Sequence, residues 1–146
     1  MNDRQLRLAA SVPIDSVRAD SRSSAPTMLF HIVLFRPRPN LSAAEISDLI
    51  RAVEDAHRAI PSIRRFHVGR RVVHGAGYEA VMRESFDYAA VIEFDDLAGL
   101  KDYLEHPAHR SLGPRFMQSF ESSMIFDYEM TDAGGVAGLA ASSSPR

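Results

Sequence analysis

The segment LFHIVLF at residues 29–35 and the segment FDYAAVIEF at residues 86–94 indicate the fold of this chain. Both are short, apolar and rich in residues that favour β-strands. In a strand formed by the first segment, His31, Val33 and Phe35 lie on one face, and equally apolar residues lie on the other. Both segments are therefore expected to be strands that are buried on both faces.

Helical segments and further strands surround these two strands. Ser42 and Glu45 have the spacing of a capping box, and an apolar stripe of helical period follows as far as Pro61. Either of two aspartates, Asp95 or Asp96, can cap a second helical region. The expected elements are a strand at 29–35, a helix at 42–60, a strand at 63–73, a loop at 75–85, a strand at 86–94, a helical region through Phe116 and Phe120 that is broken at Pro107, and a strand at 124–128.

The order strand, helix, strand, strand, helix, strand predicts an α+β fold of the ferredoxin-like βαββαβ type. Such a fold has one four-stranded antiparallel sheet with both helices on one face. Because the strands are apolar on both faces, the other face would expose a large apolar surface unless a second sheet covered it. Pairing with an identical sheet is the simplest solution, so the chain is expected to form a homodimer.

Composition narrows the class of protein. Of the 146 residues, 45% are hydrophobic and 25% are charged, as in an ordinary globular protein. A net charge of −2 argues against a nucleic-acid partner, and no apolar run approaches the roughly 20 residues that cross a membrane. The absence of cysteine excludes disulfides and thiolate metal sites. A cytoplasmic protein with neither nucleic-acid nor membrane partners is expected.

A single domain is expected at residues 28–130. Residues 1–27 mix Arg, Asp, Ser and Pro without a sustained apolar period, so they are expected to be a disordered N-terminal extension. Residues 131–146 are rich in Gly, Ala and Ser and are expected to be a disordered tail.

Five segments of this domain resemble the stress-responsive α/β-barrel (Dabb) family, a branch of the dimeric α/β-barrel proteins. They are HIVLF at 31–35, AIPSIRRFHVGR at 59–70, FDYAAVIEFDD at 86–96, DYLEHPAHRSL at 102–112 and IFDYE at 125–129. The resemblance implies a ferredoxin-like homodimer whose two sheets close around an apolar cavity for a small hydrophobic ligand. The family includes plant polyketide cyclases, which use intramolecular aldol chemistry without a metal, and stress-induced plant proteins.

The resemblance also implies catalytic residues. In the cyclases, a tyrosine and the second histidine of the HPxH segment take part in catalysis, and the matching residues here are Tyr103 and His109. A histidine that titrates near neutrality can remove a proton α to a ketone. A tyrosine hydroxyl can hydrogen-bond the enolate oxygen that develops. His109 is thus the implied base and Tyr103 the implied donor, with no cofactor, and Asp127 can orient His109.

Other residues are expected to contact the ligand. A polar His31 on an apolar strand face either contacts the ligand or has a partner inside the protein. His106 is either a ligand contact or a cap of the helix that Pro107 begins. Where the plant cyclases carry a further histidine, this chain has Ala90, which changes the polarity and shape of the pocket. The residues predicted to bind the substrate are His31, Val33, Phe35, Tyr88, Ala90 and His106.

Alternatives to a cofactor-free cyclase or lyase stay open. A non-catalytic, stress-induced homodimer that binds a small apolar ligand fits the same pattern. A metal site would combine His106 and His109 with His31 or Glu93. Neither an HExxH nor a Cys/His pattern is present, so no metal is predicted. A cofactor-independent monooxygenase has no specific marker in the sequence.

Overall fold

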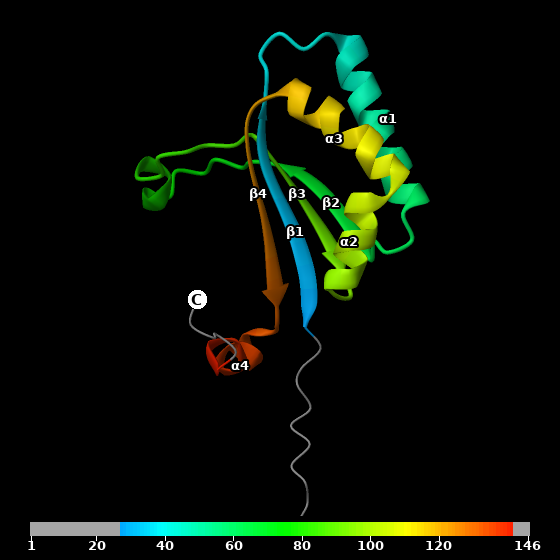
Figure 1. Ribbon diagram of the computed structural model, residues 1–146. Helices are drawn as coiled ribbons and strands as arrows, with labels where there is room; N and C mark the ends of the chain where they lie inside the picture. Colours follow the sequence, from blue (N-terminus) through cyan, green and yellow to red (C-terminus); the bar gives the residue numbers. More distant parts are fainter. Residues whose placement is uncertain (1–26, 142–146) are drawn as a thin grey trace, which may run out of the picture.

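A computed structural model describes residues 27–141 of the chain. These residues form one four-stranded antiparallel sheet, in the order β2-β3-β1-β4, with helices on one face (Figure 1). The α+β ferredoxin-like prediction is confirmed. The strands are β1 (Met28–Pro37), β2 (Arg65–Arg70), β3 (Tyr88–Phe94) and β4 (Phe120–Met130), and the helices are α1 (Ala43–Ala59), α2 (Leu97–Glu105), α3 (Pro107–Ser119) and the short α4 (Val136–Ala141).

Strand β1 lies in the middle of the sheet, between β3 and β4. His31 of β1 is in register with Ile92 on one side and with Asp127 on the other. β4 pairs with β1 along its whole length, from Met130 to Phe120. For this reason β4 is longer than the predicted strand at 124–128, and Phe120 lies in the strand rather than in the preceding helix.

Helix α1 begins with the predicted capping box. The Ser42 hydroxyl accepts a hydrogen bond from the Glu45 amide at 3.2 Å, and the Ser42 amide donates to the Glu45 carboxylate at 2.8 Å. Near the end of the helix, Ala56 is fully buried, whereas Ile46 and Ile50 in the first half are 45% and 53% exposed. The helix therefore packs tightly on the sheet at its C-terminal end and leaves space beneath its N-terminal half.

The core lies between the sheet and the helices. Leu29, His31, Val33 and Phe35 of β1 are all buried on this face, while the residues between them are half-buried. Asp96 caps α2 by accepting a hydrogen bond from the Gly99 amide at 2.9 Å, as one of the two predicted alternatives. The buried part of the core is made by Leu29, Ala56, Ile60, Ile92, Phe94, Leu100, Tyr103 and Leu112.

The opposite face of the sheet is apolar, and no helix of residues 27–141 covers it. We call this surface the open face; on β4 it carries Met124, Phe126 and Tyr128, which are between 39% and 48% exposed. Each of these residues is in register with an apolar residue of β1 that has the same orientation. The expectation that the strands are apolar on both faces therefore agrees with the structure.

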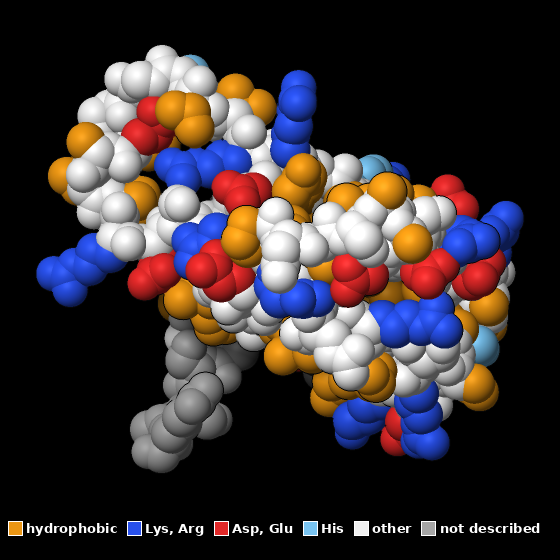
Figure 2. Space-filling model, turned by 90° about the horizontal axis from the view of Figure 1, so that it is seen from above, with side chains coloured by type: hydrophobic (Ala, Val, Ile, Leu, Met, Phe, Trp, Pro, Cys, Tyr) orange, Lys and Arg blue, Asp and Glu red, His pale blue; other side chains and the backbone are white. Residues whose placement is uncertain are grey.

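A long connection between β2 and β3 projects from the sheet. We call residues 71–87 the β2–β3 arm; it extends to the side away from α1 and α3 (Figure 1) and forms a separate lobe with hydrophobic side chains on its surface (Figure 2, upper left). The amides of His74 and Gly75 donate to the Glu79 carboxylate at 3.0 and 2.8 Å. Gly75 has a φ of +82°, a conformation that glycine adopts without strain.

The structure describes most of the C-terminal tail but almost none of the N-terminal extension. Residues 133–135 form a 3₁₀ turn that leads into α4, whereas the sequence predicts a disordered tail from residue 131 onward. Alanine and leucine favour the helix in α4, whereas the prediction of disorder is based on the Gly and Ser content of the whole tail. The predicted extension at 1–26 and residues 142–146 lie outside the described residues. Within residues 27–141, no helix has the length and apolar character to cross a membrane.

Candidate functional site

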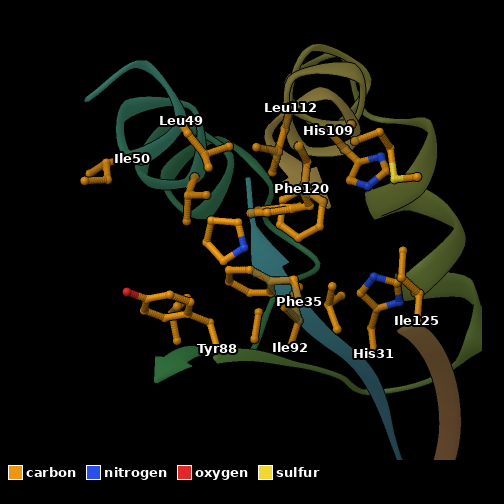
Figure 3. Close-up of a pocket in the computed structure, with 18 of the residues that line it drawn as sticks. His31, Phe35, Leu49, Ile50, Tyr88, Ile92, His109, Leu112, Phe120 and Ile125 are labelled. Carbon is orange, nitrogen blue, oxygen red and sulfur yellow. The ribbon is translucent and has the colours of Figure 1, made fainter. Parts of the chain in front are cut away.

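A cavity of about 880 Å³ lies between the sheet and the helices α1 and α3 of one chain (Figure 3). This volume is within the range of roughly 300–1,000 Å³ that is typical of small-molecule sites. The family resemblance implies a cavity between two sheets, but the site residues line this space on the helix-covered face instead. Both faces of β1 are apolar, so the strand pattern does not distinguish which of them the helices cover.

The lining of the cavity is mostly apolar, and it has a cluster of polar side chains at one end besides the charged Arg38 and Glu54. Polar groups of His31, Tyr103, His109 and Asp127 gather there, and Figure 3 shows the rings of His31 and His109 at the same end, with Tyr88 at the other. The apolar lining comes from Val33, Phe35, Leu49, Ile50, Val53, Phe66, Val68, Ala90, Ile92, Leu112, Phe116, Phe120 and Ile125, among others. An amphipathic ligand with one polar group fits such a lining.

His109 lies in the first turn of α3, two residues after the Pro107 that begins the helix. Its Nδ1 donates a hydrogen bond to the Leu104 carbonyl at 3.1 Å. Because a carbonyl only accepts, this bond assigns the proton to Nδ1 and leaves the Nε2 lone pair free in the neutral ring. Burial lowers the pKa of His109 from its ordinary 6.5, the Leu104 bond opposes this, and nearby His31 adds to it. His109 is therefore neutral and basic at pH 7.

Tyr103 lies between the two histidines. Its ring centroid is 4.3 Å from that of His109 and 5.7 Å from that of His31. Burial raises the pKa of Tyr103 to about 12, so its hydroxyl stays protonated and is available as a donor. Among residues 27–141 the hydroxyl has no hydrogen-bond partner, and it is not one of the polar atoms closed off from solvent.

Asp127 pairs with His31, not with His109. The Asp127 carboxylate accepts a hydrogen bond from Nδ1 of His31 at 2.7 Å, across the β1–β4 pair. The prediction that Asp127 orients His109 is therefore wrong, because the register places Asp127 opposite His31 and the Leu104 carbonyl takes the role at His109. The pair also answers the question left open at His31: the buried imidazole has a partner within the protein.

His106 is not brought to the cavity. Its Nδ1 accepts a hydrogen bond from the Ala108 amide at 3.1 Å. His106 therefore caps α3, which is the alternative predicted from the sequence. It lines a shallower hollow near Asp102 and Glu105 instead. Within the described part of the chain, no three His, Asp or Glu side chains converge as metal ligands, so the alternative metal site is not formed.

Of the predicted substrate-binding residues, five line the cavity together with both predicted catalytic residues. They are His31, Val33, Phe35, Tyr88 and Ala90. Sequence reasoning missed Phe116 and Phe120, whose rings lie 5.2 and 4.5 Å from that of Phe35 and form one wall. The sequence pattern predicts a helical region through both residues, and it does not indicate that they face a cavity.

Comparison with known proteins accounts for this combination of sheet, helices and cavity residues. Residues 29–130 match the model of the "Stress responsive A/B Barrel Domain" (Dabb). The chain belongs to this family. Among curated Dabb relatives, olivetolic acid cyclase of Cannabis sativa is 20% identical over 98 residues, which cover 67% of this chain and 92% of that protein.

Solved structures similar to this Dabb chain have the same fold. A hydroxynitrile lyase from Passiflora edulis superposes with a TM-score of 0.61 at 19% identity, over 74% of this chain and 97% of that one. A dimeric, ferredoxin-like protein of unknown function from Bacteroides fragilis superposes with a TM-score of 0.51 at 30% identity, over 70% and 96% of the two chains. The Dabb fold thus occurs both in proteins named as enzymes and in proteins without a known function.

Proposed function

We propose that this Dabb protein binds a small hydrophobic molecule that carries a carbonyl group and removes a proton from the carbon next to it. The observation that carries the proposal is the pairing of a neutral His109, whose Nε2 is free, with a protonated Tyr103 at 4.3 Å between ring centroids. Similarity to proteins named as a cyclase and a lyase supports an enzymatic role.

The proposed reaction needs only these side chains and no cofactor. The Nε2 lone pair of His109 takes the α-proton, and the electrons of the broken C–H bond move to the carbonyl oxygen. The Tyr103 hydroxyl donates a hydrogen bond to the enolate oxygen that results. In a cyclase, the enolate carbon then attacks a second carbonyl of the same molecule, and the new alkoxide takes the proton back from His109.

The surroundings of the pair support this chemistry. Apolar side chains line most of the cavity, and hydrogen bonds to a developing charge are stronger where water is excluded. The His31–Asp127 pair borders the same end, where the second imidazole nitrogen of His31 is available to a polar group of the ligand.

Deuterium exchange tests proton removal without knowledge of the natural substrate. The probe is 2-nonanone, a hydrophobic ketone, incubated with the full chain in D₂O buffer near neutral pH, and NMR follows loss of the α-protons. We expect the wild-type protein to accelerate exchange and His109→Ala to return the rate to that of buffer. A matched control is His57→Ala, since His57 is an exposed histidine of α1 outside the cavity.

Two results contradict the proposed activity. One is exchange no faster than in buffer with the wild-type protein, and the other is full exchange activity in a folded His109→Ala variant. Circular dichroism of each variant shows whether the fold is retained.

Binding without catalysis is the second candidate function, and the predominantly apolar lining favours it. A protein of this kind binds the ketone but does not accelerate exchange. Isothermal titration of 2-nonanone into the wild-type protein measures binding directly, so a ketone that binds without faster exchange identifies this second function.

The active form is proposed to be a homodimer that is paired through the open face. Apolar side chains of β1 and β4 cover this face, and the Bacteroides fragilis relative is described as dimeric. Sheets that pack face to face in this way lie about 10 Å apart. The expected result is sedimentation as a dimer at micromolar concentration, and sedimentation as a folded monomer would contradict the proposal.

A further inference from the structure

The β2–β3 arm carries an apolar surface that the rest of residues 27–141 does not cover. Five apolar side chains of the arm are each more than half exposed, and Gly75 and Gly77 have no heavy atom near the position of a Cβ. The exposed side chains are Val72, Val73, Tyr78, Val81 and Met82.

The arm is nevertheless held in a defined conformation by hydrogen bonds between its own residues. The Glu79 carboxylate binds two consecutive amides, those of His74 and Gly75, and Nε2 of His74 lies 2.9 Å from the Tyr78 hydroxyl. At the base of the arm, the Arg71 amide donates to the Asp87 carbonyl at 2.7 Å. A folded loop with apolar side chains on its outside is typical of a surface that contacts another molecule.

The direction of the arm identifies that molecule. The arm leaves the sheet on the side of the open face, away from α1 and α3 (Figure 1). Half of the residues 71–87, if extended, span up to about 25 Å. A second sheet packed on the open face lies only about 10 Å away, so the arm is long enough to reach beside it. A partner bound through the open face therefore lies beside the arm.

We propose that the β2–β3 arm clasps the second copy of this chain, and that its apolar side chains are buried against the partner subunit. By two-fold symmetry each subunit gives one arm and receives one. The inference rests on the homodimer proposed above, and it adds a second contact region outside the two sheets. The arm accounts for apolar surface that sheet-to-sheet packing alone leaves in water.

The chain has neither tryptophan nor cysteine, so a single tryptophan reports on the arm alone. In Tyr78→Trp, we expect blue-shifted indole emission at concentrations where the protein is a dimer, and a shift to the red on dilution into the monomer. Red-shifted emission in a variant that sediments as a dimer overturns the clasp and leaves the sheet-paired dimer intact.

Substitutions measure what the arm contributes. By sedimentation equilibrium, Val81→Asp is expected to raise the dimer dissociation constant at least tenfold. The same increase is expected for a variant in which the turn Asn-Gly replaces residues 72–86. The strands can be joined by so short a turn because Arg71 and Asp87 already pair at the base of the arm. The control, Leu97→Asp, changes a residue that is also exposed but lies on α2, and is expected to leave the constant unchanged.

The outcomes separate the two proposals. A wild-type protein that is monomeric overturns the homodimer and the clasp together. A wild-type dimer whose dissociation constant does not change in the arm variants overturns the clasp only.

Discussion

The imidazole of His31 and the carboxylate of Asp127 are joined by a 2.7 Å hydrogen bond between two neighbouring strands of the sheet. The histidine side chain is 7% exposed and the aspartate side chain 46% exposed, so the pair spans the border between the cavity and solvent. The bond fixes the proton on Nδ1 of His31 and thereby determines which nitrogen is available to a ligand.

Asp127→Ala is expected to destabilise the protein by about 1–2 kcal/mol, because a buried N–H donor loses its acceptor. Asp127→Asn retains an acceptor oxygen and is expected to cost less than half as much. Urea unfolding at one fixed protein concentration measures both. Equal losses in the two variants would show that the charge of Asp127, rather than its acceptor, stabilises His31.

The proposed activity depends on pH through His109. Since burial lowers the pKa of His109, the base is neutral at pH 7, and the exchange rate falls only as the pH drops below about 6.5. The half-maximal rate is expected on the acid side of that value. A pH profile of ketone exchange measures it, and a midpoint above 6.5 would exclude His109 as the base.

The same shift affects stability. The unfolded chain binds a proton at His109 at a higher pH than the folded chain does, so His109 favours unfolding as the pH falls through its unfolded pKa. His109→Gln is expected to remove this part of the acid destabilisation. Urea unfolding at pH 7 and pH 5, compared between wild type and variant, tests it; an identical pH dependence in both would contradict the prediction.

Tyr103→Phe separates packing from chemistry. The phenylalanine ring retains the contacts with Phe94 and His109, at centroid distances of 5.2 and 4.3 Å, so the unfolding free energy is expected to change by less than about 1 kcal/mol. The exchange rate is expected to fall roughly 100-fold, because the enolate oxygen loses its donor. NMR exchange assays and urea unfolding measure the two quantities. An unchanged rate would assign Tyr103 to the core alone.

Ala90→Leu is expected to fill part of the cavity. Ala90 is buried on the cavity side of β3, next to open space, so the larger side chain has room there and the fold is retained. Calorimetry should show affinity for 2-nonanone reduced at least tenfold. Ala98→Leu on the exposed side of α2 serves as the control, and a loss of binding there would point to a general effect on the fold.

Sequence patterns predicted most of the fold because they report local physics. The Ser42–Glu45 capping box, the Asp96 cap and the apolar strands each determine their own element. The position of the cavity depends on which face of β1 the helices cover, and a strand that is apolar on both faces does not encode this. The partner of Asp127 depends on strand register, which brings together residues that are 96 positions apart. The capping role of His106 could be predicted from the sequence, since the cap is a contact between His106 and Ala108, which are close neighbours in the chain.

The central place of β1 has a consequence for how the chain folds. β1 is the first of the strands in residues 27–141, yet both of its neighbours, β3 and β4, come much later in the chain. The sheet cannot close until the chain has formed loops of many tens of residues, and their entropy must be overcome before strand contacts compensate it. Refolding is therefore expected on the slow, millisecond-to-second scale of proteins with mostly non-local pairing. During synthesis, β1 therefore lacks one of its two neighbouring strands until β4 has left the ribosome.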